Sequence, residues 1–146
     1  MRLGGLAIAA AIALLLAFTS RVQADDSPLQ ASLSCQPAAG PGRILCELTT
    51  HAAQGKLVWS DALVVRAPAF ARPLRSRFLA QLGGAAAAGG AWAKLALVAS
   101  EPGEGKLELL ARGVVCHDGP AGEWCAPVRT RVTVDVRVGS ANSHEP

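Results

Sequence analysis

The four cysteines are the residues of this chain with the clearest chemical potential. Two thiols can close a disulfide, exchange it with a partner thiol, or bind a soft metal ion. Four cysteines allow three connectivities, and the short spacings favour Cys35–Cys46 and Cys116–Cys125, each within one predicted hairpin. We therefore expect two short-range disulfides, and disulfides of this kind indicate an oxidising, extracytoplasmic compartment.

The segment between Cys116 and Cys125 holds the densest group of functional side chains. It reads HDGPAGEW and combines turn-forming glycine and proline with His117, Asp118 and Trp124. We expect an exposed hairpin loop here, and these three side chains are candidate partner-binding residues. Zinc would need a fourth ligand beyond Cys116, His117 and Cys125, so we expect no metal.

Few other residues offer catalytic or ligand-binding chemistry. The sequence contains no G-x-S-x-G elbow, H-E-x-x-H motif or P-loop, and its histidines have no evident partner beyond Asp118, which follows His117. A carbohydrate platform would require exposed aromatic rings, for which Trp59, Trp92 and Trp124 are available. Nothing in the sequence indicates a cofactor, and we expect none.

The first 24 residues have the pattern of a secretory signal peptide. A short basic start precedes the apolar run Leu6–Phe18, and Val22 and Ala24 are the small residues expected before a cleavage site. The run has 13 residues, fewer than the roughly 20 that span a bilayer. We predict cleavage after Ala24, no stable membrane insertion afterwards, and export to the bacterial periplasm or cell exterior.

The rest of the chain, after residue 24, is nearly neutral. Without Arg2 and Arg21, 12 basic side chains stand against 11 acidic ones. No segment concentrates positive charge, which argues against a nucleic-acid ligand. Arg75 and Arg77 alternate with apolar residues, and we interpret them as a solvated strand face.

The segments between turn signals alternate apolar and polar residues, as strands with one buried face do. Strands are predicted at 30–35, 43–50, 74–82, 91–100, 106–116 and 129–138, with a short helix as the alternative at 74–82. The segment 57–66 has two short apolar runs split by Ser60 and Asp61 and is predicted to be a bulged or bent strand. We predict one all-β domain over 25–139, a single antiparallel β-sandwich of immunoglobulin-like type with about seven strands. Residues 140–146 are predicted to form a flexible tail.

Two loops and one polar residue complete the predicted domain. The loop 67–73 contains Phe70, which either packs at the edge of the core or contacts a partner, and we keep it as a candidate partner-binding residue. The segment GGAAAAGG at 83–90 is predicted to be a flexible loop. Asp61 interrupts an apolar strand, and its burial stays open.

The closing hairpin resembles a known family. Residues 107–134 (LELLARGVVCHDGPAGEWCAPVRTRVTV) resemble part of the amino-terminal periplasmic domain of DsbD-type thiol–disulfide reductases. That domain is an immunoglobulin-like sandwich with two cysteines on facing ends of a hairpin, the second following a bulky aromatic residue as Cys125 follows Trp124 here. This chain differs by its eight-residue spacing and by Val128 in place of a second proline. The resemblance implies that Cys116 and Cys125 accept electrons from partner thiols.

Three functional hypotheses follow. The first is a non-enzymatic interaction module that binds another extracytoplasmic protein through its loops. The second is a thiol–disulfide exchange module that uses Cys116 and Cys125 with a thioredoxin-like partner. The third is a small-ligand or carbohydrate-binding domain. The first is preferred, because a structural disulfide stabilises a small exported domain by about 2–4 kcal/mol and needs no further role.

Overall fold

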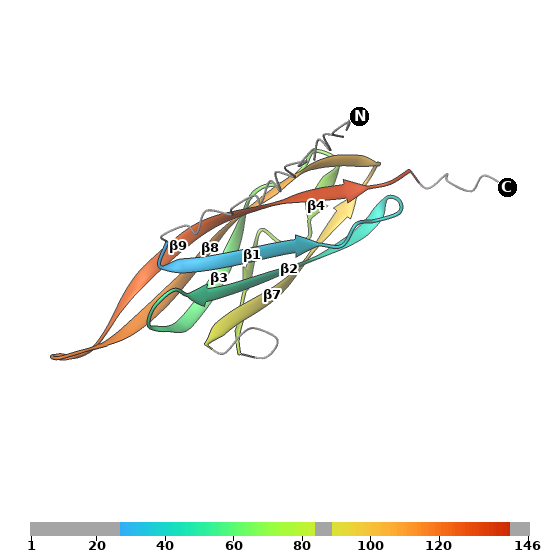
Figure 1. Ribbon diagram of the computed structural model, residues 1–146. Coiled ribbons are helices and arrows are strands. Elements are labelled where there is room, and N and C mark those ends of the chain that lie inside the picture. Colours follow the sequence, from blue (N-terminus) through green and yellow to red (C-terminus); the bar gives the residue numbers. More distant parts are fainter. Residues whose placement is uncertain (1–26, 84–88, 141–146) are drawn as a thin grey trace, which may run out of the picture.

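The computed structural model describes residues 27–83 and 89–140 (Figure 1). The described part is all-β and antiparallel, which confirms the predicted fold class. The predicted signal peptide, most of the 83–90 loop and most of the tail lie outside these residues. Within them, no helix is long and apolar enough to cross a membrane.

In the described part of the chain, nine strands form two sheets. Their bounds are β1 Leu29–Cys35, β2 Gly42–Ala52, β3 Lys56–Arg66, β4 Ala71–Pro73, β5 Arg77–Leu79, β6 Gln81–Leu82, β7 Gly90–Ala99, β8 Gly103–Gly119 and β9 Gly122–Val138. One sheet has the order β1-β2-β7-β4, with β6 also paired to β7, and the other has the order β5-β3-β8-β9. The two sheets enclose one apolar core, as in a β-sandwich. Its immunoglobulin-like character stays a prediction.

The core is built from alternate residues of strands in both sheets. Ile44, Leu48 and Leu97 come from one sheet and Leu107 and Leu109 from the other, and each is at most 1% exposed. They belong to a single cluster of buried residues. Burying one such side chain contributes about 1.5–3 kcal/mol, so the predicted alternation is what holds the two sheets together.

The segment 74–82 is not the single strand that its alternation predicts. The chain leaves the first sheet after β4, forms β5 against β3 in the second sheet, and returns as β6 against β7. Pro73 ends β4, because proline has no N–H for the ladder. The backbone N–H of Ala80 donates to the Ser60 carbonyl at 3.0 Å during the return. Two short strands therefore replace one predicted strand.

The β8–β9 hairpin is the longest element. Each strand has 17 residues, and the ladder continues to Gly119 and Gly122, so that only Pro120 and Ala121 form the turn. Gly122 has a φ of 109°, which glycine adopts without steric cost. The predicted eight-residue loop between the cysteines is therefore wrong, because strand pairing persists to the tip.

The end of this hairpin extends past the sandwich. The neighbouring strand β3 follows β8 only as far as the pair of Lys56 with Cys116. Beyond that point β8 and β9 pair with each other alone and project from the body (Figure 1). We call residues 116–125 the arm. The disulfide candidate Cys116–Cys125 lies at its base.

Candidate functional site

Both disulfides join residues that lie directly opposite each other on neighbouring antiparallel strands. Cys35 pairs with Cys46 across β1 and β2, and Cys116 pairs with Cys125 across β8 and β9. The Cα atoms are 4.0 Å apart in both pairs. The predicted connectivity is confirmed, and two disulfides are expected of a chain that folds in an oxidising, extracytoplasmic environment.

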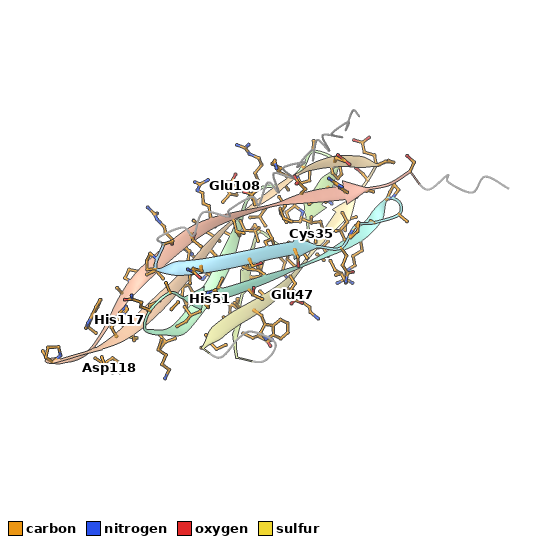
Figure 2. The ribbon with its side chains drawn as sticks, viewed as in Figure 1. Cys35, Glu47, His51, Glu108, His117 and Asp118 are labelled. Carbon is orange, nitrogen blue, oxygen red and sulfur yellow. A yellow bond between two sulfur atoms is a disulfide. The ribbon has the colours of Figure 1, made fainter. Side chains whose placement is uncertain are left out.

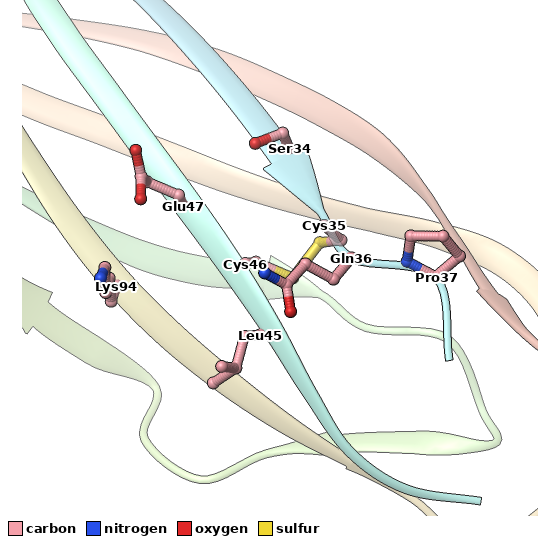
Figure 3. Close-up of a pocket in the computed structure, with 8 residues that line it drawn as sticks. All are labelled: Ser34, Cys35, Gln36, Pro37, Leu45, Cys46, Glu47 and Lys94. Carbon is pink, nitrogen blue, oxygen red and sulfur yellow. A yellow bond between two sulfur atoms is a disulfide. The ribbon is translucent and has the colours of Figure 1, made fainter. Parts of the chain in front are cut away.

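The surroundings of the two disulfides differ. Cys46 is 2% exposed and belongs to the core cluster, against which Cys35 packs. Figure 3 shows this bridge at the side of a shallow pocket of about 410 Å³. Cys116 is 4% exposed, but Cys125 is exposed, and neither belongs to the core cluster. One bridge is therefore part of the core and the other borders solvent.

The arm presents an aromatic stack on one face. The register places His117 opposite Trp124, and their rings are stacked with centroids 4.5 Å apart and planes 22° apart. Trp124 remains 54% exposed. A Cβ atom added at Gly55 would lie 2.8 Å from the His117 ring, so the turn between β2 and β3 packs closely on this stack. His117 and Asp118 are labelled near the far end of the hairpin in Figure 2.

The opposite face of the arm carries the disulfide and two carboxylates. Asp118 lies opposite Glu123 in the register, and both side chains are exposed. The sulfur atoms of Cys116 and Cys125 and a carboxylate oxygen of Glu123 lie within 4.8 Å of one another. Both sulfur atoms are bonded in the disulfide and cannot act as thiolate ligands in this state. The strand alternation also directs His117 to the other face, away from them.

The structure brings together three of the four candidate partner-binding residues. His117, Asp118 and Trp124 share the arm. Phe70 is 9% exposed and packs at the opposite end of β8, where a Cβ atom at Gly103 would lie 2.6 Å from its ring. Of the two alternatives that the sequence left open for Phe70, its burial agrees with packing at the edge of the core.

The three tryptophans do not form a common platform for a sugar. Trp59 is on β3, where the Arg112 guanidinium lies 6.0 Å from its ring centroid. Trp92 is on the other sheet, and the Lys94 ammonium lies 5.6 Å from its ring centroid. With Trp124 on the arm, the three rings occupy separate surfaces.

A buried charge cluster that joins β3, β5 and β8 in the body of the protein was not anticipated. Asp61 is fully buried and accepts hydrogen bonds from Arg112 Nε at 2.8 Å, Arg112 Nη2 at 2.5 Å and Arg77 Nε at 2.7 Å. Burial alone would raise the pKa of Asp61, but the hydrogen bonds and charges of the two guanidinium groups outweigh it and hold this pKa below its ordinary value of 3.8. Arg77 is therefore an ion-pair partner and not a freely solvated residue.

Comparison with known proteins finds no matching family model, no similar curated protein and no similar solved structure. The description of this protein therefore rests on its own structure. It is an all-β, sandwich-like protein with two cross-strand disulfides and a projecting arm.

Proposed function

We propose that this protein is an exported, non-enzymatic interaction module that binds another extracytoplasmic protein through the arm. The observation that carries the proposal is Trp124, a large aromatic side chain left 54% exposed at a projecting position. Tryptophan is enriched among the residues that dominate binding energy at protein interfaces. The bacterial periplasm or the cell exterior is the proposed location, since the predicted signal peptide and the disulfides both favour export.

The arm is organised before any partner binds. The Cys116–Cys125 disulfide ties its two strands, and the stack on His117 holds the Trp124 indole. Fixing an interface side chain in advance reduces the entropy that binding must overcome, by about 0.5–1.5 kcal/mol for each side chain. Asp118 and Glu123 add negative charge at the tip, which favours a partner with a basic docking surface.

Site-specific photo-crosslinking in cells that produce the protein tests this proposal. A photoreactive amino acid is placed at position 118 or 124, and at Val65 as a control. Val65 is 44% exposed and lies near the end of β3 far from the arm. We expect an adduct of one defined mass from positions 118 and 124 and none from position 65. No adduct from the arm, or the same adduct from all three positions, would contradict the proposal.

A second candidate function is thiol–disulfide exchange, favoured by the exposure of Cys125. A partner thiolate attacks Sγ of Cys125, a mixed disulfide forms, and Cys116 leaves as a thiolate. A second partner thiol then attacks the partner's own sulfur in the mixed disulfide and releases the Cys125 thiolate. The partner dithiol is oxidised to a disulfide, and the arm gains two electrons. The sequence resemblance to DsbD-type reductases supports this candidate.

The reduction potential of the Cys116–Cys125 pair separates the two candidates. Structural bridges lie below about −300 mV, whereas exchanging bridges are more oxidising. Equilibration with dithiothreitol buffers followed by alkylation and mass spectrometry measures both disulfides in one sample, so Cys35–Cys46 is an internal control. A potential above about −250 mV for the arm pair alone supports exchange. Equal, low potentials for both pairs leave the interaction module as the function.

A further inference from the structure

A second candidate site lies outside the arm, where the chain crosses from β4 in the first sheet to β5 in the second. β4 pairs with residues 97–99 of β7 and β6 with residues 91–92, and the Leu74 backbone N–H donates to the Ala96 carbonyl at 3.0 Å. Residues 93–95 have no strand partner on this side among the described residues. The chain crosses to β5 at this gap. A groove of about 280 Å³ opens here, and its lining includes Arg43, Leu74, Arg75, Phe78, Lys94 and Leu95. We call it the cationic groove.

Three positive charges converge on the cationic groove. Arg43 comes from β2, Lys94 from β7 and Arg75 from the crossing segment, and all three side chains are exposed. The ion pairs formed among the described residues involve none of them. No carboxylate therefore neutralises these cations through an ion pair, although the Lys94 ammonium also lies 5.6 Å from the Trp92 ring centroid. They come from segments far apart in the sequence, which is why the sequence shows no basic patch.

The nearest acidic residue in the register does not neutralise the groove. Glu47 lies opposite Lys94 on β2, and both line the neighbouring pocket shown in Figure 3. Within the described part of the chain no ion pair joins their side chains, and the lining of the cationic groove includes no carboxylate. The local charge therefore stays positive.

The groove also offers an apolar surface beside the charges. Leu95 is 6% exposed and Phe78 is half-buried, while Leu74 is 60% exposed at the entrance. A ligand that joins an anionic group to an apolar body would contact both parts of the lining. A volume of about 280 Å³ lies close to the lower end of the range for ligand pockets, so the occupant is small or is the end of a larger molecule.

We propose that the cationic groove binds a phosphate monoester that carries an apolar substituent. A phosphate monoester has close to two negative charges at neutral pH and three acceptor oxygens, which suits two guanidinium groups and an ammonium better than one carboxylate does. The apolar substituent rests on Leu74 and Phe78. This inference is independent of the arm, because none of residues 116–125 lines the groove.

Calorimetric titration at about 50 mM salt with three soluble probes tests the inference. Phenyl phosphate carries both features, inorganic phosphate only the anion, and benzyl alcohol only the apolar group. We expect phenyl phosphate to bind at least about fivefold more tightly than inorganic phosphate, because burying part of its ring adds apolar contact. Benzyl alcohol should show no binding. Equal affinity for phenyl phosphate and inorganic phosphate, or no binding of either, would overturn the proposal.

Matched variants assign the binding to the groove. The double variant Arg75→Gln/Lys94→Gln should weaken phenyl phosphate binding at least about tenfold, because two charge-assisted hydrogen bonds are lost. Arg129→Gln removes one exposed cation from the other sheet and should leave the affinity unchanged. All three positions are exposed, and unchanged melting temperatures verify folding. If the double variant and Arg129→Gln lost phenyl phosphate affinity equally, binding would depend only on the net charge of the protein. The cationic groove would then be rejected as the binding site.

Vesicles identify the source of the phosphate group. Vesicles of phosphatidylcholine with phosphatidic acid present the same monoester on a lipid, and pure phosphatidylcholine vesicles are the control. Sedimentation of the protein with the acidic vesicles, lost in Arg75→Gln/Lys94→Gln, would assign the ligand to a lipid headgroup. Binding of phenyl phosphate without sedimentation would assign it to a soluble ester. Sedimentation that survives the double variant would contradict a role for the groove in lipid binding.

Discussion

The two disulfides share one geometry and differ in everything around them. Each links directly opposed residues of an antiparallel pair, with sequence separations of 11 for Cys35–Cys46 and 9 for Cys116–Cys125. Chain-entropy arguments assign both loops a similar stabilisation, about 2.5–3 kcal/mol. The first bridge is continuous with the core, however, whereas the second ties a part of the hairpin that contributes nothing to the core.

This difference teaches how one covalent device serves two purposes. At Cys46 the disulfide occupies core volume and joins the first strand of the chain to its sheet. At Cys125 it holds two strands together where a third strand no longer supports them. The arm can therefore hold Trp124 and the acidic residues Asp118 and Glu123 at a fixed position without using residues of the core.

Removing each bridge in turn gives the largest expected effect. We expect Cys35→Ala/Cys46→Ala to lower the free energy of unfolding by about 3–5 kcal/mol, because the loop constraint and buried sulfur contacts are both lost. Cys116→Ala/Cys125→Ala should cost about 2–3 kcal/mol, because little core packing is lost. Urea denaturation followed by tryptophan fluorescence measures both values.

The slope of the denaturation curve is the control for this pair of variants. An unchanged slope shows that the difference lies in stability and not in the extent of unfolding. If Cys116→Ala/Cys125→Ala lost as much stability as Cys35→Ala/Cys46→Ala, or more, the proposed difference between the two disulfides would be wrong. If Cys116→Ala/Cys125→Ala keeps a folded but less stable body, this would support the difference between the two disulfides.

Much of the sandwich could be predicted from sequence, because each strand carries its own evidence. Val132, Val134, Val136 and Val138 alternate with polar residues, and this local pattern requires one buried face. The cysteine spacings likewise limited the disulfide connectivity. The local pattern did not predict that 74–82 would divide into two short strands in different sheets. That division depends on which edges of β3 and β7 are available for pairing, and the sequence of 74–82 does not contain this information.

The functional features depend on contacts between distant residues, and these escaped the sequence. The segment HDGPAGEW is rich in turn formers, yet it pairs as strand because the disulfide and the His117–Trp124 stack hold it extended. Asp61 finds its partners 16 and 51 residues away. The sequence did show a lone aspartate in an apolar strand and arginines in other predicted strands, which is the composition of a buried ion pair. It did not show which strands are neighbours or in which register they pair, so the partners of Asp61 could not be predicted.

The Asp61 cluster gives a smaller test of how separate the arm is from the body. Asp61→Asn leaves two arginines without their carboxylate, and we expect a loss of about 2–3 kcal/mol at pH 7, less than for a fully buried pair because Arg77 is 56% and Arg112 36% exposed. The Asp61 carboxylate has a lowered pKa in the folded state, so its contribution is complete above pH 3.8 and is lost as pH falls below it.

The pH dependence distinguishes this ion cluster from a simple packing defect. The wild type should lose stability below pH 3.8 more steeply than Asp61→Asn, and the two curves should approach each other in acid. Asp135→Asn is the control, since its pKa is also lowered, by Lys106, but on an exposed surface where solvent weakens the pair. Hydrogen exchange of residues 117–124 should stay unchanged in Asp61→Asn if the disulfide and the His117–Trp124 stack order the arm. Faster exchange there would show that the order of the arm depends on the Asp61 cluster in the body, which would contradict the independence of arm and body.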